Sequence, residues 1–110
     1  MLEELYDTIL LIREYIEEEI YGPIANREQR ISLRQYEAYI KRLPDNQKVL
    51  YMAYIIFMDK IFMEGNRRTA FILLKTYYKI DNDILLNIMQ NSITNNYTKE
   101  TFIVEVSKYV

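Results

Sequence analysis

The sequence contains no cysteine and no histidine. The absence of cysteine excludes disulfides and thiolate metal sites, and the absence of histidine removes the commonest metal ligand and general base. Any chemistry must therefore use carboxylates, lysine, arginine, tyrosine or hydroxyl groups. Only two glycines and two prolines occur among 110 residues, which leaves few places for tight turns and favours a mostly helical fold.

Neither sign of charge is in large excess, because 14 basic and 16 acidic residues give a formal net charge of −2. This balance disfavours a surface that coats nucleic acid. Charges interrupt every apolar run before it reaches a bilayer-spanning length, and the N-terminal stretch is too rich in glutamate for a signal or transit peptide. We therefore expect a soluble, cytoplasmic protein without a membrane partner, folded as one domain over residues 1–110.

Apolar residues at three- and four-residue steps predict an N-terminal helix. Its apolar stripe comprises Leu2, Leu5, Tyr6, Ile9, Ile12, Tyr15, Ile16 and Ile20. Gly22 and Pro23 then end the helix. Residues 23–44 leave two possibilities open, a polar loop or a short hairpin, before a helix from Ser32 to Arg42.

Two apolar segments in the middle of the chain predict a buried helical hairpin. Asp45 can cap the first of these helices, and apolar residues lie almost all round it from Val49 to Phe62. The second apolar run, from Ala70 to Leu74, follows Gly65. We expect these two helices to form the centre of an all-α bundle.

The last third of the chain predicts two shorter helices. Asp81 to Asp83 form a turn and cap, the next helix is marked by four apolar residues, and residues 91–98 are a polar connection. Those four residues are Ile84, Leu85, Ile88 and Met89. A final helix begins near Thr98 and is expected to dock through Phe102, Ile103, Val106, Tyr109 and Val110.

The stretch "EGNRRT", residues 64–69, has the components of an anion site. A helix N-terminus exposes amides without partners in the helix, and together with the helix dipole these attract an anion. Gly65 permits a positive φ angle, Asn66 can cap the following helix, and Glu64 offers a hard oxygen ligand for Mg²⁺. Arg67 and Arg68 in the first turn oppose the dipole by about 0.3–1 kcal/mol each, unless an anion lies between them.

A plainer alternative stays open for the same stretch. Gly65 and Asn66 would only cap two helices, while Glu64, Arg67 and Arg68 would be solvated or paired with opposite charges.

This segment resembles the motif of the Fic/Doc family, His-x-Phe-x-(Asp/Glu)-(Gly/Ala)-Asn-(Gly/Lys)-Arg between two helices. The matching positions hold Phe62, Glu64, Gly65, Asn66 and Arg68. Arg67 stands where the Doc branch usually has lysine, and Thr69 and Ala70 match the Thr-Ala that follows there. The resemblance extends from Gln47 to the C-terminus, and it implies a compact Fic/Doc-like helical bundle around a central buried helical hairpin.

The resemblance also implies binding of ATP with Mg²⁺, and transfer of AMP or phosphate to a hydroxyl of a target protein. Glu64 would hold the metal, and Phe62 would anchor the loop in the core. The phosphate-binding residues would be Gly65, Asn66, Arg67, Arg68 and Thr69. The implied partners are a nucleotide, a target protein and an antitoxin-like protein.

The position of the family's catalytic histidine is occupied by Lys60. A lysine is ordinarily protonated at neutral pH, so it cannot take the proton of an attacking hydroxyl unless burial changes this. Loss of a positioned base typically removes about 10²–10⁴-fold in rate but leaves phosphate binding intact. We therefore predict a phosphate-binding loop over Lys60–Ala70 and a transferase activity that is lost or impaired.

Other functions remain as alternatives. Lys60 or another group could support a working transferase, or the chain could be a non-catalytic helical protein-interaction module on the Fic scaffold. Nucleic-acid binding is disfavoured, because the run after Arg68 faces inward and the last helix has few side chains for base edges. Residues Arg27 to Arg34 lie where Fic proteins carry the flap that aligns a target strand.

Overall fold

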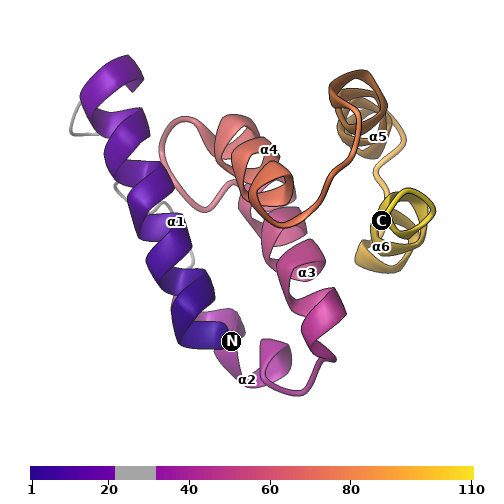
Figure 1. Ribbon diagram of the computed structural model, residues 1–110, viewed down its shortest axis with the longest axis horizontal. Coiled ribbons are helices and arrows are strands. Elements are labelled where there is room, and N and C mark those ends of the chain that lie inside the picture. The colour runs from indigo at the N-terminus through magenta and orange to yellow at the C-terminus, as the bar shows by residue number, and fades with distance from the viewer. Residues whose placement is uncertain (22–31) are drawn as a thin grey trace.

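The computed structural model describes residues 1–21 and 32–110, and these residues form an all-α bundle (Figure 1). The fold class predicted from the sequence is confirmed. The elements are α1 (Leu2–Ile16), η1 (Glu17–Tyr21, a π-helical turn), η3 (Leu33–Tyr36, a 3₁₀ helix), α2 (Glu37–Ile40), α3 (Asp45–Met58), α4 (Asn66–Tyr77), α5 (Asn82–Thr94) and α6 (Lys99–Ser107). Within the described ranges, no helix is long and apolar enough to cross a bilayer.

The pair α3 and α4 forms the centre of the bundle, as the sequence predicts. Figure 1 shows α1 on one side of this pair and α5 and α6 on the other, and α1 packs on α4 while α6 packs on α3. Almost every side chain of α3 from Val49 to Phe57 is buried. The central hairpin therefore places the turn between α3 and α4 at one end of the core.

α1 buries one face, as its periodicity predicts. Leu5, Ile9, Ile12 and Ile16 all lie in the core. Tyr15 does not, and its assignment to the apolar stripe was wrong, because it falls at the edge of the stripe and half of its side chain is exposed. The predicted helix end at Gly22 and Pro23 lies outside the described residues.

The helix predicted from Ser32 is present, as η3 followed by α2. Ser32 and Gln35 form a capping box, in which the Ser32 hydroxyl accepts from the Arg34 amide at 3.3 Å and the Gln35 side chain accepts from the Ser32 amide at 3.1 Å. Leu33 and Arg34 are therefore helical and cannot belong to an extended flap. The remaining part of the suggested flap, residues 27–31, lies outside the described residues.

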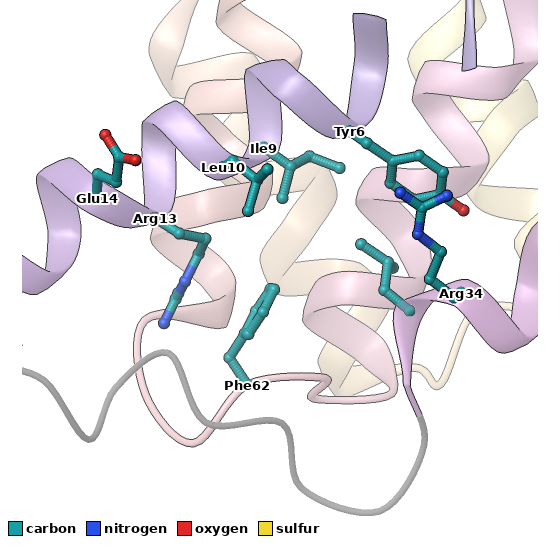
Figure 2. A pocket seen from close by; sticks show the side chains of 8 residues that line it. Tyr6, Ile9, Leu10, Arg13, Glu14, Arg34 and Phe62 are labelled. Carbon is teal, nitrogen blue, oxygen red and sulfur yellow. The ribbon is translucent and has the colours of Figure 1, made fainter. Parts of the chain in front are cut away.

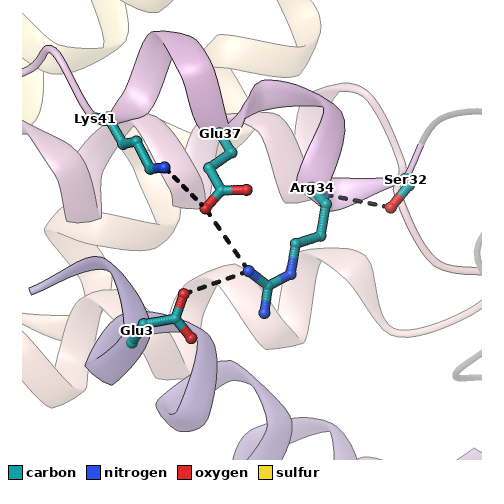
Figure 3. Close-up of polar contacts among 5 residues, drawn as sticks. All are labelled: Glu3, Ser32, Arg34, Glu37 and Lys41. Atoms are coloured by element: carbon teal, nitrogen blue, oxygen red, sulfur yellow. Dashed lines mark hydrogen bonds and ion pairs between the residues drawn. The ribbon is translucent and has the colours of Figure 1, made fainter.

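Ion pairs connect this segment to the start of α1 (Figure 3). Arg34 Nη1 lies 3.4 Å from Glu3 and 3.8 Å from Glu37, and Lys41 lies 3.5 Å from Glu37. The Arg34 guanidinium also stacks 4.0 Å from the centre of the Tyr6 ring. Exposed ion pairs contribute little by themselves, so the stacking on Tyr6 supplies most of the specific contact.

Two details of α3 differ from the prediction. Its N-cap is Pro44, and Asp45 is the first helical residue and caps no amide; instead its carboxylate lies 3.0 Å from Lys48 Nζ. The helix also ends at Met58, before Ile61 and Phe62, although both of these side chains are buried. The chain thus leaves the helix while still inside the core.

The cap at the start of α5 is confirmed, because Asp81 accepts from the amides of Asp83 and Ile84 at 2.9 and 3.3 Å. The helix is longer than predicted. Residues 91–94, predicted as part of a polar connection, complete α5 because Ser92 is buried and its hydroxyl donates to the Ile88 carbonyl at 2.7 Å. That internal bond lets a polar residue face the core.

The start of α6 is also confirmed, with Thr98 as N-cap accepting from the Thr101 amide at 3.2 Å. Phe102 and Val106 are buried as expected. The expected docking of Tyr109 and Val110 was wrong: α6 ends at Ser107, and both side chains beyond it are exposed.

Candidate functional site

The turn between α3 and α4 begins with a helix cap that is built on lysine. The Ile61 amide donates to the Ile56 carbonyl at 3.3 Å, which is the six-to-one bond of a Schellman cap, and Lys60 sits between them with φ 51°. Glycine is the usual residue at this position, because a left-handed conformation costs other residues about 1–2 kcal/mol. The Lys60 side chain is exposed. The turn thus keeps a lysine, with an exposed side chain, at a position that carries some conformational cost.

Asp59, directly before Lys60, is held by a tyrosine of η3. The Tyr36 hydroxyl donates to Asp59 Oδ2 at 2.7 Å. Burial, followed by this hydrogen bond, raises the pKa of Tyr36 to about 12. Asp59 makes no ion pair with Lys60 in the described part of the chain.

Phe62 anchors the turn in the core, as the sequence predicts. Its side chain is buried, and the guanidinium of Arg13 from α1 lies 4.1 Å from the ring centre (Figure 2). Its main chain is clamped by Asn66, whose Oδ1 accepts from the Phe62 amide at 2.8 Å and whose Nδ2 donates to the Phe62 carbonyl at 2.7 Å. The turn is therefore rigid on both sides of this phenylalanine.

The clamp changes the role predicted for Asn66, which was wrong as a helix cap. The N-cap of α4 is Gly65, with φ 76° and ψ 20°, and no side chain caps the helix. The first main-chain bond at this end runs from the Thr69 amide to the Gly65 carbonyl at 2.9 Å. The amides of residues 66–68, before Thr69, have no partner within the helix. The positive end of the helix dipole is therefore uncapped, as an anion site requires.

Lys60, Asn66 and Arg67 come together in one pocket of about 410 Å³. Its other walls come from α3 and from the end of α5, and they comprise Phe57, Met58, Ile93 and Asn96. Arg67 is also tethered to α5, because its Nη2 donates to Gln90 Oε1 at 3.4 Å. The pocket thus combines two cations, an open helix N-terminus and the polar side chain of Asn96, just after α5.

Three other predicted site residues do not line this pocket. Glu64, Gly65 and Arg68 are absent from its walls, and the side chains of Glu64 and Arg68 are exposed. Of the two predicted phosphate-binding arginines, only Arg67 lines the pocket, although Arg68 is the one that matches the arginine of the motif.

Thr69 is buried behind the turn. Its hydroxyl donates to the Gly65 carbonyl at 2.7 Å and accepts from Arg13 Nη1 at 2.8 Å. The hydroxyl is thus engaged inside the protein, where it connects α1 to the first turn of α4.

Sequence analysis missed Arg13, Ile93 and Asn96 as residues around this turn. Arg13 had a detectable signal, since a charged residue within the buried stripe of α1 requires a polar partner. No such signal exists in the sequence for Asn96 and Ile93, because only the packing of α5 brings them near Lys60.

Glu64 is the single carboxylate of the turn after Asp59. No group of three or more acidic, histidine or cysteine side chains that could hold a metal is found among the described residues. Magnesium is commonly held by one or two carboxylates together with phosphate oxygens and water. Glu64 fits such a site only if a bound nucleotide supplies the remaining oxygens.

Comparison of the chain with protein-family models, with curated proteins and with solved structures found no match.

Proposed function

We propose that this protein is a Fic/Doc-like helical domain whose loop Lys60–Ala70 binds the phosphates of a nucleotide. The observation that carries the proposal is the pocket of about 410 Å³ in which Lys60 and Arg67 meet Asn66 at the start of α4. A nucleotide polyphosphate would supply the negative charge that pairs with these cations and with the uncapped amides of the helix. ATP is the nucleotide implied by the motif resemblance.

The placement of the cations supports this proposal. Arg67 and Arg68 lie in the first turn of α4, where positive charge opposes the helix dipole by about 0.3–1 kcal/mol each. Lys60 adds a third cation at a left-handed position where glycine would be less strained. Strained residues of this kind cluster at functional sites, and a bound anion would offset all three unfavourable placements.

In the proposed complex, Arg67 and Lys60 contact the phosphates from the pocket, the amides at the start of α4 receive them, and Arg68 contacts them from outside. Thr69 contributes indirectly, by holding the Gly65 carbonyl and Arg13. Glu64 would hold Mg²⁺ together with phosphate oxygens, and the ion would neutralise phosphate charge.

Transfer of AMP or phosphate to a protein hydroxyl is proposed to be lost or impaired, because Lys60 replaces the histidine of the motif. An exposed ammonium group attracts phosphate but accepts no proton from an attacking hydroxyl. A target protein and an antitoxin-like protein remain proposed partners, and the cytoplasm, which supplies ATP and Mg²⁺, is the proposed location.

The binding proposal is tested by thermal unfolding with ATP and Mg²⁺. At a nucleotide concentration of 100 times the dissociation constant, the native state gains about 2.7 kcal/mol, which raises the melting temperature. Arg67→Gln should reduce this gain. Arg42→Gln is the matched control, because Arg42 is exposed and lies outside the turn. An equal shift in both variants, or no shift in the wild type, contradicts the proposal.

The catalytic part is tested separately with ATP labelled on the α- or the γ-phosphate and a cell lysate as acceptor. We expect little transfer by the wild type, and a gain of roughly 10²–10⁴-fold in Lys60→His if the missing base is the main defect. Wild-type transfer as fast as that of Lys60→His would show instead that the protein is a working transferase.

A non-catalytic protein-interaction module is the second candidate. The exposed leucines of α1, Leu10 and Leu11, favour it. It predicts no effect of ATP or Mg²⁺ on the melting temperature.

A further inference from the structure

The outward face of α1 carries apolar side chains that nothing in the described structure covers. Leu10, Leu11 and Tyr15 are 61%, 67% and 51% exposed. Leu11 and Tyr15 are one helical turn apart and therefore adjacent on the surface, whereas Leu10 lies about 100° round the helix from Leu11. Figure 1 shows α1 at the edge of the molecule, with α4 on its inner side, and η3 contacts its start through Arg34. Isolated exposed leucines are ordinary, but three exposed large apolar side chains on the outward half of one helix are not, and we call these three side chains the patch.

Acidic residues lie between Leu10 and Leu11 on the outward face of the helix. Asp7 and Glu14 lie one turn from Leu10 and Leu11, and Glu18 lies one turn beyond Tyr15. No ion pair is found for these three carboxylates in the ranges that the structure describes, although Glu3 at the start of the helix pairs with Arg34. The patch therefore sits within unneutralised negative charge.

The net charge of α1 and η1 together is more negative than that of the rest of the chain. Residues 2–21 contain seven acidic side chains and one basic one, a formal charge of −6, whereas the whole chain carries −2. The single basic residue of the segment, Arg13, is buried. An anionic membrane surface would be repelled by such a face, and a cationic partner would be attracted.

A hollow beside the patch provides a place for an anchoring side chain. Leu10 forms part of the wall of a second pocket of about 410 Å³, which Phe62, Arg13 and Arg34 also line (Figure 2). Tyr6, Ile9 and Leu33 contribute further apolar walls. Helices that bind in grooves commonly insert one or two apolar anchors in this way.

We infer that the face formed by Leu10, Leu11, Tyr15, Asp7, Glu14 and Glu18 docks a basic amphipathic helix of a partner protein. Lysines or arginines of the partner pair with the acids of α1, and its apolar residues contact Leu10 on one side of these acids and Leu11 and Tyr15 on the other. This inference is independent of the proposed phosphate site, which uses none of these residues.

The probe for this surface is a synthetic amphipathic peptide of leucine and lysine, about four helical turns long, with leucines at three- and four-residue steps. The control is the same peptide with glutamate in place of lysine. Amide chemical shifts of the labelled protein, recorded during titration, give both the affinity and the residues affected. We expect the lysine peptide to bind, to shift residues of α1, and to weaken as salt is added.

Two pairs of variants make the test specific. Leu10→Ser with Leu11→Ser should weaken binding by roughly tenfold, because two exposed leucines no longer contribute apolar area. Val104→Ser is its control, since Val104 is 57% exposed on α6. Asp7→Asn with Glu14→Gln should weaken binding by about threefold or more at low salt, whereas Asp83→Asn with Glu100→Gln should not.

The inference is overturned if both peptides bind equally, if the shifts fall on another surface, or if the α1 variants bind as tightly as the wild type. It is also overturned if the wild type forms a dimer that Leu10→Ser with Leu11→Ser dissociates, because the face is then covered by a second copy. All these variants change exposed side chains, and circular dichroism establishes that each one is folded.

Discussion

At the scale of single residues, the turn between α3 and α4 depends on side chains that work inside the protein. Asn66 holds both main-chain groups of Phe62, and Thr69 joins Arg13 to the Gly65 carbonyl. These bonds fix the turn, and no side chain caps the first turn of α4. Lys60 and Arg67 then supply the charge.

The contribution of Thr69 can be isolated with an internal control. Thr69 and Thr76 both donate to the carbonyl four residues earlier, at 2.7 and 2.8 Å, but Thr69 alone is buried and also accepts from Arg13. Thr69→Val should therefore lower the free energy of unfolding by about 1–3 kcal/mol, because it deprives Arg13 of an acceptor inside the core. Thr76→Val should change it by less than about 0.5 kcal/mol. Urea unfolding monitored by circular dichroism measures the free energy of unfolding of both variants. Equal losses of stability in the two would count against the role of Thr69 as the acceptor for Arg13.

Lys60 offers a test that separates stability from binding. Lys60→Gly removes the left-handed strain of about 1–2 kcal/mol, but it adds unfolded-state entropy of about 0.5–1 kcal/mol. We expect the variant to be as stable as the wild type, or more stable, and to bind ATP with Mg²⁺ more weakly. A variant that loses stability but keeps its affinity would show that the lysine serves only the fold. Urea unfolding and calorimetric titration give the two quantities.

At the scale of elements, sequence periodicity predicted the helices that bury one face, and local chemistry predicted several of their ends. α1 and α6 follow from the spacing of their apolar residues, and Asp81 and Thr98 cap helices because a cap needs only the next three residues. Asn66 has the same capping chemistry but bonds to Phe62 instead. Whether Asn66 caps the helix or bonds to Phe62 depends on the path of the turn. That path is determined by the burial of the Phe62 side chain.

The site could be predicted only in part, for the same reason. Lys60 and Arg67 are near in sequence and were found from the motif, whereas Asn96, just after α5, and Arg13 of α1 are distant from them in the sequence. The exposure of Leu10 and Leu11 follows from their positions outside the buried stripe of α1 in a helical-wheel projection. That they remain uncovered depends on where the other helices pack.

The bond between η3 and the end of α3 gives an element-level prediction about pH. Tyr36 has an ordinary pKa of 10.0, which burial and the bond to Asp59 raise to about 12 in the folded protein. Because the folded-state pKa is the higher one, the stabilisation is complete below pH 10 and is lost as the pH rises towards 12. Tyr36→Phe should therefore be less stable than the wild type at neutral pH, and the difference should shrink over that range.

Urea unfolding at a series of pH values measures this difference. Tyr109→Phe is the control, because Tyr109 is exposed and lies beyond α6. A gap between wild type and Tyr36→Phe that stays constant up to pH 12 would rule out the proposed role of the Asp59 bond.

At the scale of the whole molecule, two oppositely charged regions lie on different sides of the central hairpin. Lys60 and Arg67 line a pocket beside Ile93 at the end of α5, and Figure 1 shows α1, which carries the acidic residues, on the other side of the hairpin from α5. At physiological salt, charges separated by more than about 8 Å are largely screened from each other. The two regions can therefore bind ligands of opposite charge independently.

This separation predicts that Asp7→Asn with Glu14→Gln leaves the affinity for ATP with Mg²⁺ unchanged at physiological salt, while it weakens binding of the lysine peptide. Calorimetric titration with each ligand measures both affinities. A change of more than about tenfold in ATP affinity would mean that the acidic face and the phosphate pocket are coupled.

The most direct test of the central claim is a crystal structure of the protein with a non-hydrolysable ATP analogue and Mg²⁺. We predict that the phosphates occupy the pocket at the start of α4, with oxygens about 3 Å from Lys60, Arg67 and the first amides of the helix. A nucleotide bound elsewhere, or no bound nucleotide at saturating concentration, would contradict the claim.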